Sequence, residues 1–144
     1  MATPFPPTLT VTALHDPVID SLGFDPTADY LEIVTLPVIG PSALWTYRRL
    51  SAQLAQQDSY PVELVFLAEC IGLGRGTGSN SPICRTLSRL VQFGFAARPD
   101  DATLAVRPKA PWLPERSIRR LHPDLQRAHR ALLAVHQDQH RLAG

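Results

Sequence analysis

Glycine and proline divide this chain into short segments, and they limit the folds that it can adopt more than any other feature. Four glycines occupy alternate positions in residues 72–80, a stretch that cannot continue a helix without a high cost in conformational entropy. Pro41, Pro61 and Pro82 each precede a stretch with helical periodicity, and proline is favoured in the first turn of a helix. The sequence therefore predicts short helices separated by sharp breaks.

Apolar residues recur at helical spacing after each of these prolines. The helices are expected over residues 41–57, 61–71 and 82–94. Ser81 is the expected N-cap of the third helix, and Gly94 ends it. Two short strands are then predicted at residues 95–98 and 103–107, joined by a turn that contains Pro99.

The two ends of the chain are predicted to lie outside this central unit. Residues 1–40 are expected to form a proline-rich arm, which is extended and poorly ordered around Pro4–Pro7. The arm also holds a predicted helical turn at residues 17–22, capped by Asp16, and a short strand at residues 30–36. A last helical region is expected over residues 114–142, with a break at His122-Pro123. The predicted organisation is an arm (1–40), a central domain (41–110) and a C-terminal extension (111–144).

The charges are distributed unevenly over the 144 residues, although the net charge is only +1. Residues 1–40 contain five acidic and no basic residues, whereas residues 41–110 and 111–144 each carry a net charge of +3. Thirteen of the fourteen basic residues are arginine, which binds phosphates and guanine edges with a planar fork. The near-neutral total is therefore compatible with a polyanionic partner.

The composition excludes several classes of protein. No apolar run of 18 or more residues could cross a membrane, and residues 1–15 lack the positive charge of a secretory signal. Cys70 and Cys84 do not form a disulfide framework, which indicates a reducing compartment and a cytoplasmic protein. We expect both to be buried thiols rather than metal ligands or a redox pair.

The order of helix, helix, glycine turn, helix and hairpin resembles the winged helix-turn-helix domain of bacterial transcription regulators, broadly the MarR-like and ArsR-like group. The resemblance covers residues 41–107, and it is most specific in residues 81–95, which end in Leu-x-x-Leu-Val-x-x-Gly-Phe. Residues 36–42 are also similar to small actinobacterial proteins of uncharacterised function. The turn is longer and richer in glycine than is usual for such regulators. The resemblance implies a mainly α fold with a small β-hairpin wing, an N-terminal arm and a C-terminal helix.

The same resemblance implies a regulator of transcription that binds double-stranded DNA sequence-specifically, as a homodimer. The recognition helix places its polar residues opposite its apolar stripe. The residues expected to contact bases are Arg85, Ser88, Arg89 and Gln92. The residues expected to contact the DNA backbone are Arg75, Thr77, Ser79, Ser81, Arg98 and Arg107. Asp100 and Asp101 at the tip of the wing argue against its deep insertion into DNA, because carboxylates repel phosphates.

The C-terminal helix carries apolar residues at heptad spacing, which predicts a helix that forms a dimer or docks on the body of the protein. The predicted dimer residues are Leu125, Ala128, Leu132, Val135 and Leu142. His122, His129, His136 and His140 lie along the flank of this stripe, where we expect a solvated edge rather than a metal site.

No catalytic motif emerges, so we expect neither an enzyme nor a cofactor or metal. The glycine stretch is not a nucleotide-binding loop, because it follows a predicted helix and lacks a Gly-Lys-Ser/Thr ending. The alternative function is a winged-helix module that binds a protein, through residues 16–32 or the C-terminal helix, and never DNA. A continuous basic face around Arg85, Arg89 and Arg107 would favour DNA, and capping of these arginines by carboxylates of the arm would favour the module.

Overall fold

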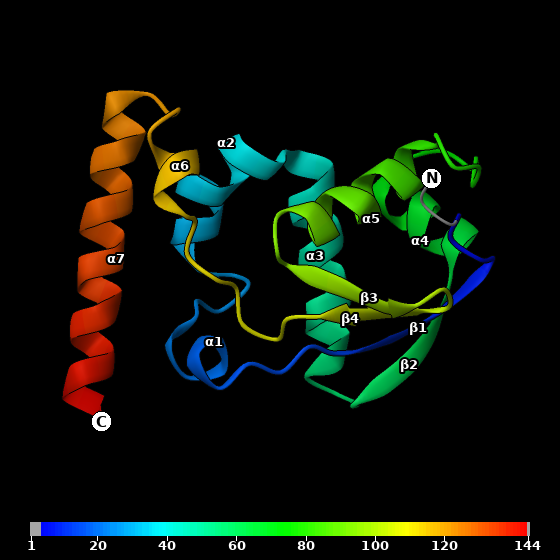
Figure 1. Cartoon of the computed structure of the whole chain (residues 1–144), viewed down its shortest axis with the longest axis horizontal. Helices are drawn as coiled ribbons and strands as arrows, with labels where there is room; N and C mark the ends of the chain where they lie inside the picture. Colours follow the sequence, from blue (N-terminus) through cyan, green and yellow to red (C-terminus); the bar gives the residue numbers. More distant parts are fainter. Residues whose placement is uncertain (1–3, 144) are drawn as a thin grey trace.

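The winged helix-turn-helix prediction is wrong, because the chain forms an α/β fold around a four-stranded mixed sheet. The computed structural model describes residues 4–143. The strands are β1 (Thr8–Ala13), β2 (Ser59–Glu63), β3 (Ala96–Asp100) and β4 (Thr103–Val106), in the spatial order β2-β1-β4-β3. β1 pairs antiparallel with β2 and parallel with β4, so that Val11 faces both Tyr60 and Leu104 (Figure 1). The hairpin β3–β4 is therefore one edge of a larger sheet and not a separate wing.

The segment predicted as an extended arm supplies β1, one of the two inner strands of the sheet. Its sequence alternates threonine with apolar residues, and Leu9 and Val11 are fully buried whereas Thr8 and Thr10 are exposed. This alternation is typical of a strand with one face on the core. The prolines just before this alternation predict an extended arm, whereas the alternation itself predicts the strand that forms.

Most of the predicted helices are present, with changed boundaries. The α-helices are α1 (Pro17–Leu22), α2 (Leu36–Ile39), α3 (Pro41–Leu54), α4 (Leu64–Ile71), α5 (Pro82–Gln92), α6 (Glu115–Ile118) and α7 (Pro123–Ala143). Asp16 caps α1 as predicted, since its carboxylate accepts from the amides of Val18 and Ile19 at 2.9 and 3.2 Å. The break at His122-Pro123 is also confirmed, because it separates α6 from α7.

Two predicted elements are of the wrong type. The expected strand at residues 30–36 is a π-helical turn, η1 (Leu31–Thr35), that continues into α2. Its buried residues Leu31, Val34 and Thr35 lie on one face of a helix. The β-branched composition predicts a strand and this spacing predicts a helix, and the structure follows the spacing. Pro61 does not begin a helix but lies in β2 opposite Thr10, and α4 begins only after Glu63.

The main core lies between the sheet and the helices α3 and α5, with α3 contacting β1 and β4 while α5 contacts β3. Tyr47 of α3 packs edge-on against Phe95, with ring centroids 5.1 Å apart, and donates its hydroxyl to the carbonyl of Arg107 at 2.8 Å. α7 stands at one end of the molecule, far from the sheet, where it packs on η1 and α6 (Figure 1). The helices α2, α5 and α6 thereby lie along one side of the molecule.

The central position of β1 gives a direct test. Leu9→Ala should lower the free energy of unfolding by about 2–5 kcal/mol, because it removes a fully buried side chain and leaves a cavity between strand and helices. Thr10→Ala, the matched control on the exposed face of the same strand, should change it by less than about 1 kcal/mol. Urea titration of both variants measures this difference. If both substitutions change the free energy of unfolding by the same small amount, residues 8–13 would lie outside the core, as an arm does.

Candidate nucleic-acid interface

Helix α5 carries the strongest candidate site, and local sequence signals fix its ends and its orientation. Ser81 caps it by accepting from the amide of Cys84 at 3.4 Å, and Pro82 is its first residue. Ile83, Leu87 and Leu90 are fully buried and hold the helix on the core. Helix α5 packs on α3 and β3, so its other face turns away from the body.

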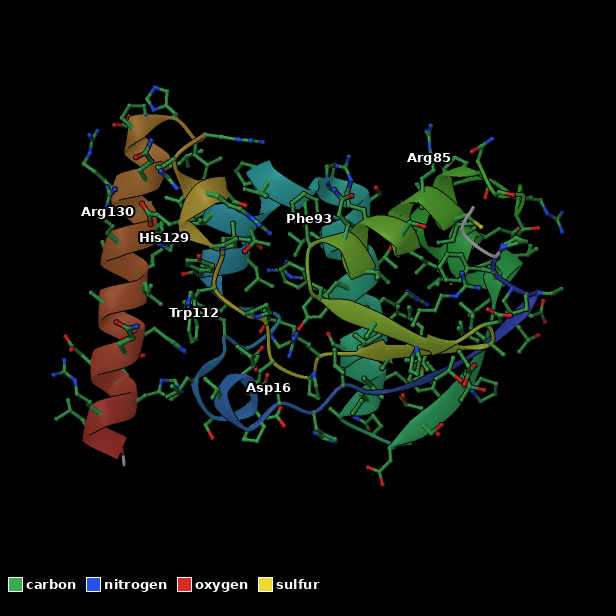
Figure 2. All side chains as sticks on the ribbon, in the orientation of Figure 1. Asp16, Arg85, Phe93, Trp112, His129 and Arg130 are labelled. Carbon is green, nitrogen blue, oxygen red and sulfur yellow. The ribbon has the colours of Figure 1, made fainter. Side chains whose placement is uncertain are left out.

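The polar face of α5 is exposed, as its spacing predicted. Arg85, Ser88, Arg89 and Gln92 are all exposed, while Thr86 is turned inward and donates to the carbonyl of Pro82 at 2.8 Å. Figure 2 shows the side chain of Arg85 extending outward from α5, away from the sheet. The four residues expected to contact bases therefore share one accessible surface.

A groove of about 600 Å³ runs between this face and the start of α3. We call it the α5 groove. Its polar lining comes from Ser42, Ser79, Arg85, Thr86, Ser88, Arg89 and Gln92. None of the residues that line it is acidic, and the sequence has no Asp or Glu between Glu69 and Asp100. Two guanidiniums without nearby carboxylates make the groove electropositive.

Arg89 has a structural contact within the α5 groove. Its Nη1 donates to the carbonyl of Ile39 at 3.2 Å and lies 3.5 Å from the position that a Cβ on Gly40 would take. Gly40 has a φ of +88°, a conformation that side-chain-bearing residues rarely adopt. Arg89 thus links α5 to the junction of α2 and α3, whereas Arg85 forms no ion pair within residues 4–143.

The glycine segment contributes less to this surface than expected. Arg75 is exposed but forms an ion pair with Glu69 at 3.0 Å, and the carbonyl of Thr77 accepts from the thiol of Cys84 at 3.5 Å. Ser81 is used as the helix cap, and Ser79 lines the α5 groove. Of these predicted backbone contacts, Ser79 is the one that the fold brings to the groove.

The two arginines of the predicted wing are used inside the fold. Arg98 lies 4.0 Å from the ring centroid of Phe5 and donates to the carbonyls of Pro4 and Asp101 at 3.0 Å. Arg107 donates from Nε to the carbonyl of Gly94 at 2.6 Å and has Asp16 4.0 Å away. Because the hairpin is part of the sheet, these side chains do not project as those of a wing would. The expected continuous basic face therefore includes Arg85 and Arg89 but not Arg107.

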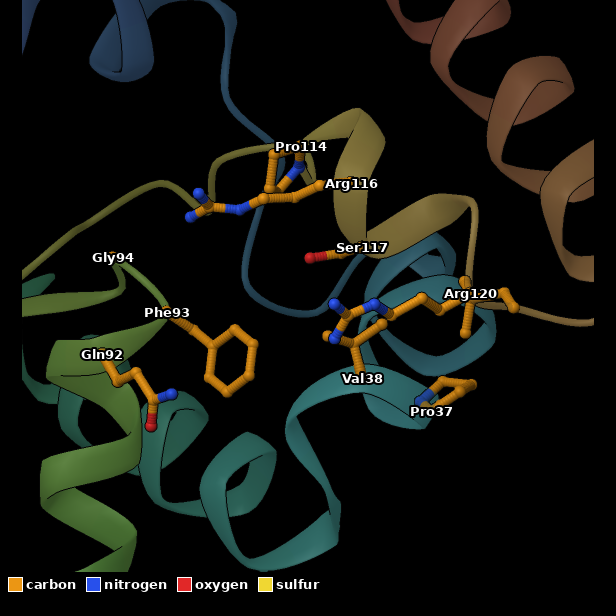
Figure 3. Close-up of a pocket in the computed structure, with 10 residues that line it drawn as sticks. Pro37, Val38, Gln92, Phe93, Gly94, Pro114, Arg116, Ser117 and Arg120 are labelled. Atoms are coloured by element: carbon orange, nitrogen blue, oxygen red, sulfur yellow. The ribbon is translucent and has the colours of Figure 1, made fainter.

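A second cleft, of about 620 Å³, lies between α2, the end of α5 and α6, and sequence reasoning missed it. Arg116, Ser117 and Arg120 line one wall, and Figure 3 shows Arg120 directed toward Phe93 on the opposite side and Arg116 extending toward Gly94. We call it the α6 cleft. It adjoins the α5 groove, since Gln92 lines both. The spacing of Arg116 and Arg120, four residues apart, indicates two arginines on one side of a helical turn. The sequence does not indicate that Phe93, from a distant segment, lies across the cleft.

The cysteines are free thiols, and the glycine segment is a loop that follows a helix. Cys84 is buried and Cys70 half-buried, and both are free thiols. No group of three or more metal-ligating side chains occurs in the part of the chain that the structure describes. The glycine segment follows helix α4, which ends at Gly72 with a φ of +79°. It therefore lacks the preceding strand of a dinucleotide-binding loop.

Helix α7 docks on the body of the protein through part of its predicted heptad stripe. Ala128 and Leu132 are partly buried against the core, and Leu125 is half-buried. Val135 and Leu142 remain 56% and 88% exposed. Body docking thus accounts for the middle of the stripe, and dimerisation through α7 stays a prediction that depends on the two exposed residues.

The histidine stripe is not a uniformly solvated edge. His129 is buried, and its Nδ1 lies 2.8 Å from the hydroxyl of Tyr30, which also accepts from the amide of Leu113 at 3.0 Å. His136 stacks on Phe24 at 4.1 Å, and His122 is exposed as expected. Two of the four histidines therefore attach α7 to the body.

Comparison of the chain with protein-family models, curated proteins and solved structures finds no match. No helix in residues 4–143 is long and apolar enough to span a membrane.

Stability should depend on pH through His129. Burial lowers the pKa of this imidazole below its ordinary value of 6.5; the nearby carboxylate of Glu115 opposes the shift and Arg130 adds to it. Burial also raises the pKa of Tyr30 to about 12, so its hydroxyl keeps the proton that it can donate to Nδ1. Because the unfolded chain binds a proton at higher pH than the folded one, this contribution is complete above 6.5 and lost as the pH falls below it.

The test compares unfolding free energies at a pH of about 7.5 and about 5. His129→Gln should show a weaker loss on acidification than the wild type, while His122→Gln, at the exposed end of the stripe, should behave as the wild type does. The same acid sensitivity in the wild type and in His129→Gln would exclude His129 as its source.

Proposed function

We propose that this protein binds double-stranded DNA through the exposed face of α5 and acts as a regulator of transcription. The observation that carries the proposal is the α5 groove, where Arg85 and Arg89 face solvent with no acidic residue in the lining. The proposal does not need a winged helix. It needs one helix held firmly on a core with its polar face outward.

The residues of this face suit contacts with both bases and phosphates. Arginine pairs with O6 and N7 of guanine, and glutamine pairs with N6 and N7 of adenine, so Arg85 and Gln92 are the proposed base-reading residues. Helix α3 begins at Pro41 in the same groove, with no side-chain cap on its first amides. Pro41 has no amide hydrogen and Ala43 is fully buried, so the amide of Ser42 is the candidate donor to a phosphate oxygen at this end of the helix. Arg89 positions this junction through its bond to Ile39.

Two further expectations belong to the proposal. A homodimer would double the number of phosphate contacts and so raise the affinity of a protein whose net charge is only +1. Val135 and Leu142 are the predicted dimer residues that stay exposed on α7. Two free thiols fit a reducing compartment, so we place the protein in the cytoplasm. Sedimentation of the wild type and of a Val135→Glu variant tests the dimer.

A protein partner is the second candidate function. The ion pair of Arg107 with Asp16 of the N-terminal segment favours it, and so do two exposed aromatic residues. Trp45 and Phe66 are 59% and 56% exposed, on α3 and α4. Trp45 borders an open hollow of about 650 Å³ with Ala52, Cys70 and Ile71. Exposed aromatic residues are enriched at protein interfaces. This surface does not include the α5 groove, so Trp45→Ala should leave DNA affinity unchanged.

The DNA proposal predicts a specific effect of Arg85→Ala. On a labelled duplex enriched by the wild type from a random pool, the variant should bind about 5- to 100-fold more weakly, since one well-formed arginine–base pair contributes about 1–3 kcal/mol. Fluorescence anisotropy against salt measures both the affinity and its dependence on ionic strength. Gln92→Ala should relax the base preference more than it lowers affinity for unrelated duplexes.

Arg130→Ala is the matched control, because it also removes one exposed positive charge, on α7 at the far end of the molecule from Arg85 (Figure 2). It should change the affinity by less than about twofold. No enrichment of any duplex, together with no anisotropy change up to about 10⁻⁴ M protein at low salt, would refute DNA binding. Equal losses in the Arg85 and Arg130 variants would refute α5 as the contact face.

A further inference from the structure

The α6 cleft is a second site with its own chemistry. Its volume of about 620 Å³ lies within the usual range for small-molecule sites. We propose that it binds a small organic anion, namely a carboxylate or a phosphate monoester carried on a flat apolar body. This inference does not depend on DNA binding by α5.

The anionic part is inferred from the arginines of the cleft. Arg116 and Arg120 both line it; Figure 3 shows the guanidinium of Arg120 opposite the Phe93 ring and that of Arg116 extending across the cleft toward Gly94. The lining holds no acidic residue, and within residues 4–143 neither guanidinium forms an ion pair. Glu115, the nearest carboxylate in sequence, is not part of the lining. Guanidinium groups bind carboxylates and phosphates through paired, charge-assisted hydrogen bonds.

The apolar part is inferred from the opposite walls. The ring of Phe93 stands between Gln92 and Arg120, and Pro37, Val38 and Pro114 complete an apolar lining (Figure 3). Phe93 is half-buried, and a flat apolar group can stack on the part of the ring that lines the cleft while its acidic group contacts an arginine. Gln92 and Ser117 supply additional hydrogen-bonding groups at the edges of the cleft. A bare inorganic anion would leave the apolar walls unused.

The walls are held in place by buried contacts, so the cleft exists before a ligand binds. Ile118, the last residue of α6, lies between Arg116 and Arg120 in the sequence and is fully buried, and the amide of Leu113 just before α6 donates to Tyr30. On the other side, the carbonyl of Ile39 at the end of α2 accepts from Arg89. A preorganised site loses less free energy to ordering when it binds.

The cleft also offers a route for a ligand to influence α5. Gln92 lines both the α6 cleft and the α5 groove, and Phe93 follows it directly. An anion in the cleft would therefore contact a residue that the DNA proposal assigns to base recognition. Any coupling between the two sites must be reciprocal in free energy.

The experiment uses the full chain and four probes: benzoate, phenyl phosphate, inorganic phosphate and neutral benzyl alcohol. Calorimetry, with amide and methyl NMR shifts, should show saturable binding of benzoate or phenyl phosphate with a Kd of about 1 mM or below, and perturbed signals of Gln92 and Val38. Whichever of the two binds more tightly identifies the acidic group. Inorganic phosphate and benzyl alcohol should each bind at least about tenfold more weakly, because each lacks one half of the ligand.

Arg116→Gln and Arg120→Gln should each weaken the preferred probe by about tenfold, a loss expected for one charge-assisted contact. Arg119→Gln is the matched control: it is exposed on the same helical segment but does not line the cleft, and it should change the Kd by less than about twofold. All three positions are exposed, and circular dichroism checks that the variants fold.

Three results would overturn the proposal. The first is an absence of saturable binding of both aromatic anions up to about 10 mM. The second is equal affinity for phenyl phosphate and inorganic phosphate, which would reduce the site to general positive charge. The third is an equal loss in the Arg119 control, which would place binding outside the cleft. None of these results bears on the Arg85 test, so failure here is distinguishable from failure of the DNA proposal.

Discussion

The parallel pairing of β1 with β4 is the interaction on which the rest of the structure depends. It joins residues about ninety positions apart, with Val11 opposite Leu104. The two segments stay together beyond the sheet, because Leu14 donates to the carbonyl of Val106 and Phe24 exchanges two backbone hydrogen bonds with Ala110. Phe24 then stacks on Tyr30, which binds both Leu113 and His129. One long alignment thus positions the sheet, α6 and α7.

This alignment determines which arginines remain available for function. A hairpin inside a sheet cannot project, so Arg107 lies against Gly94 and Asp16 and takes part in holding the fold. Helix α5 lies above the edge strand β3, and α6 follows the segment that pairs with Phe24. Both helices lie along one side of the molecule (Figure 1), and the α5 groove and the α6 cleft, which share Gln92, adjoin each other. The available cationic surface is a consequence of topology and not of composition.

Sequence reasoning predicted what depends on near neighbours in the chain. The caps of α1 and α5, the buried stripe of α5 and the exposure of Arg85 all follow from spacings of four residues or fewer. It failed where distant segments meet. Parallel strands are not joined by a short turn, so the sequence around Thr8–Ala13 does not indicate which distant segment pairs with it. The α6 cleft was missed for the same reason, because Arg120 meets Phe93 only after the chain has folded.

The acidic first forty residues now have a structural explanation that separates them from the candidate sites. Asp16 lies near Arg107, Asp25 near Lys109 and Glu32 near Arg48, each within 4.0 Å. These pairs join the N-terminal segment to later parts of the chain, and none involves a residue of α5 or α6. The segment therefore balances the positive charge of the structural arginines and lysine and leaves Arg85 and Arg120 without carboxylate neighbours in their grooves. A net charge of +1 conceals this division, since the sum counts charges that are already neutralised by contact. The electrostatic potential at the surface that a partner contacts is set by the exposed arginines that have no carboxylate beside them, such as Arg85 and Arg120.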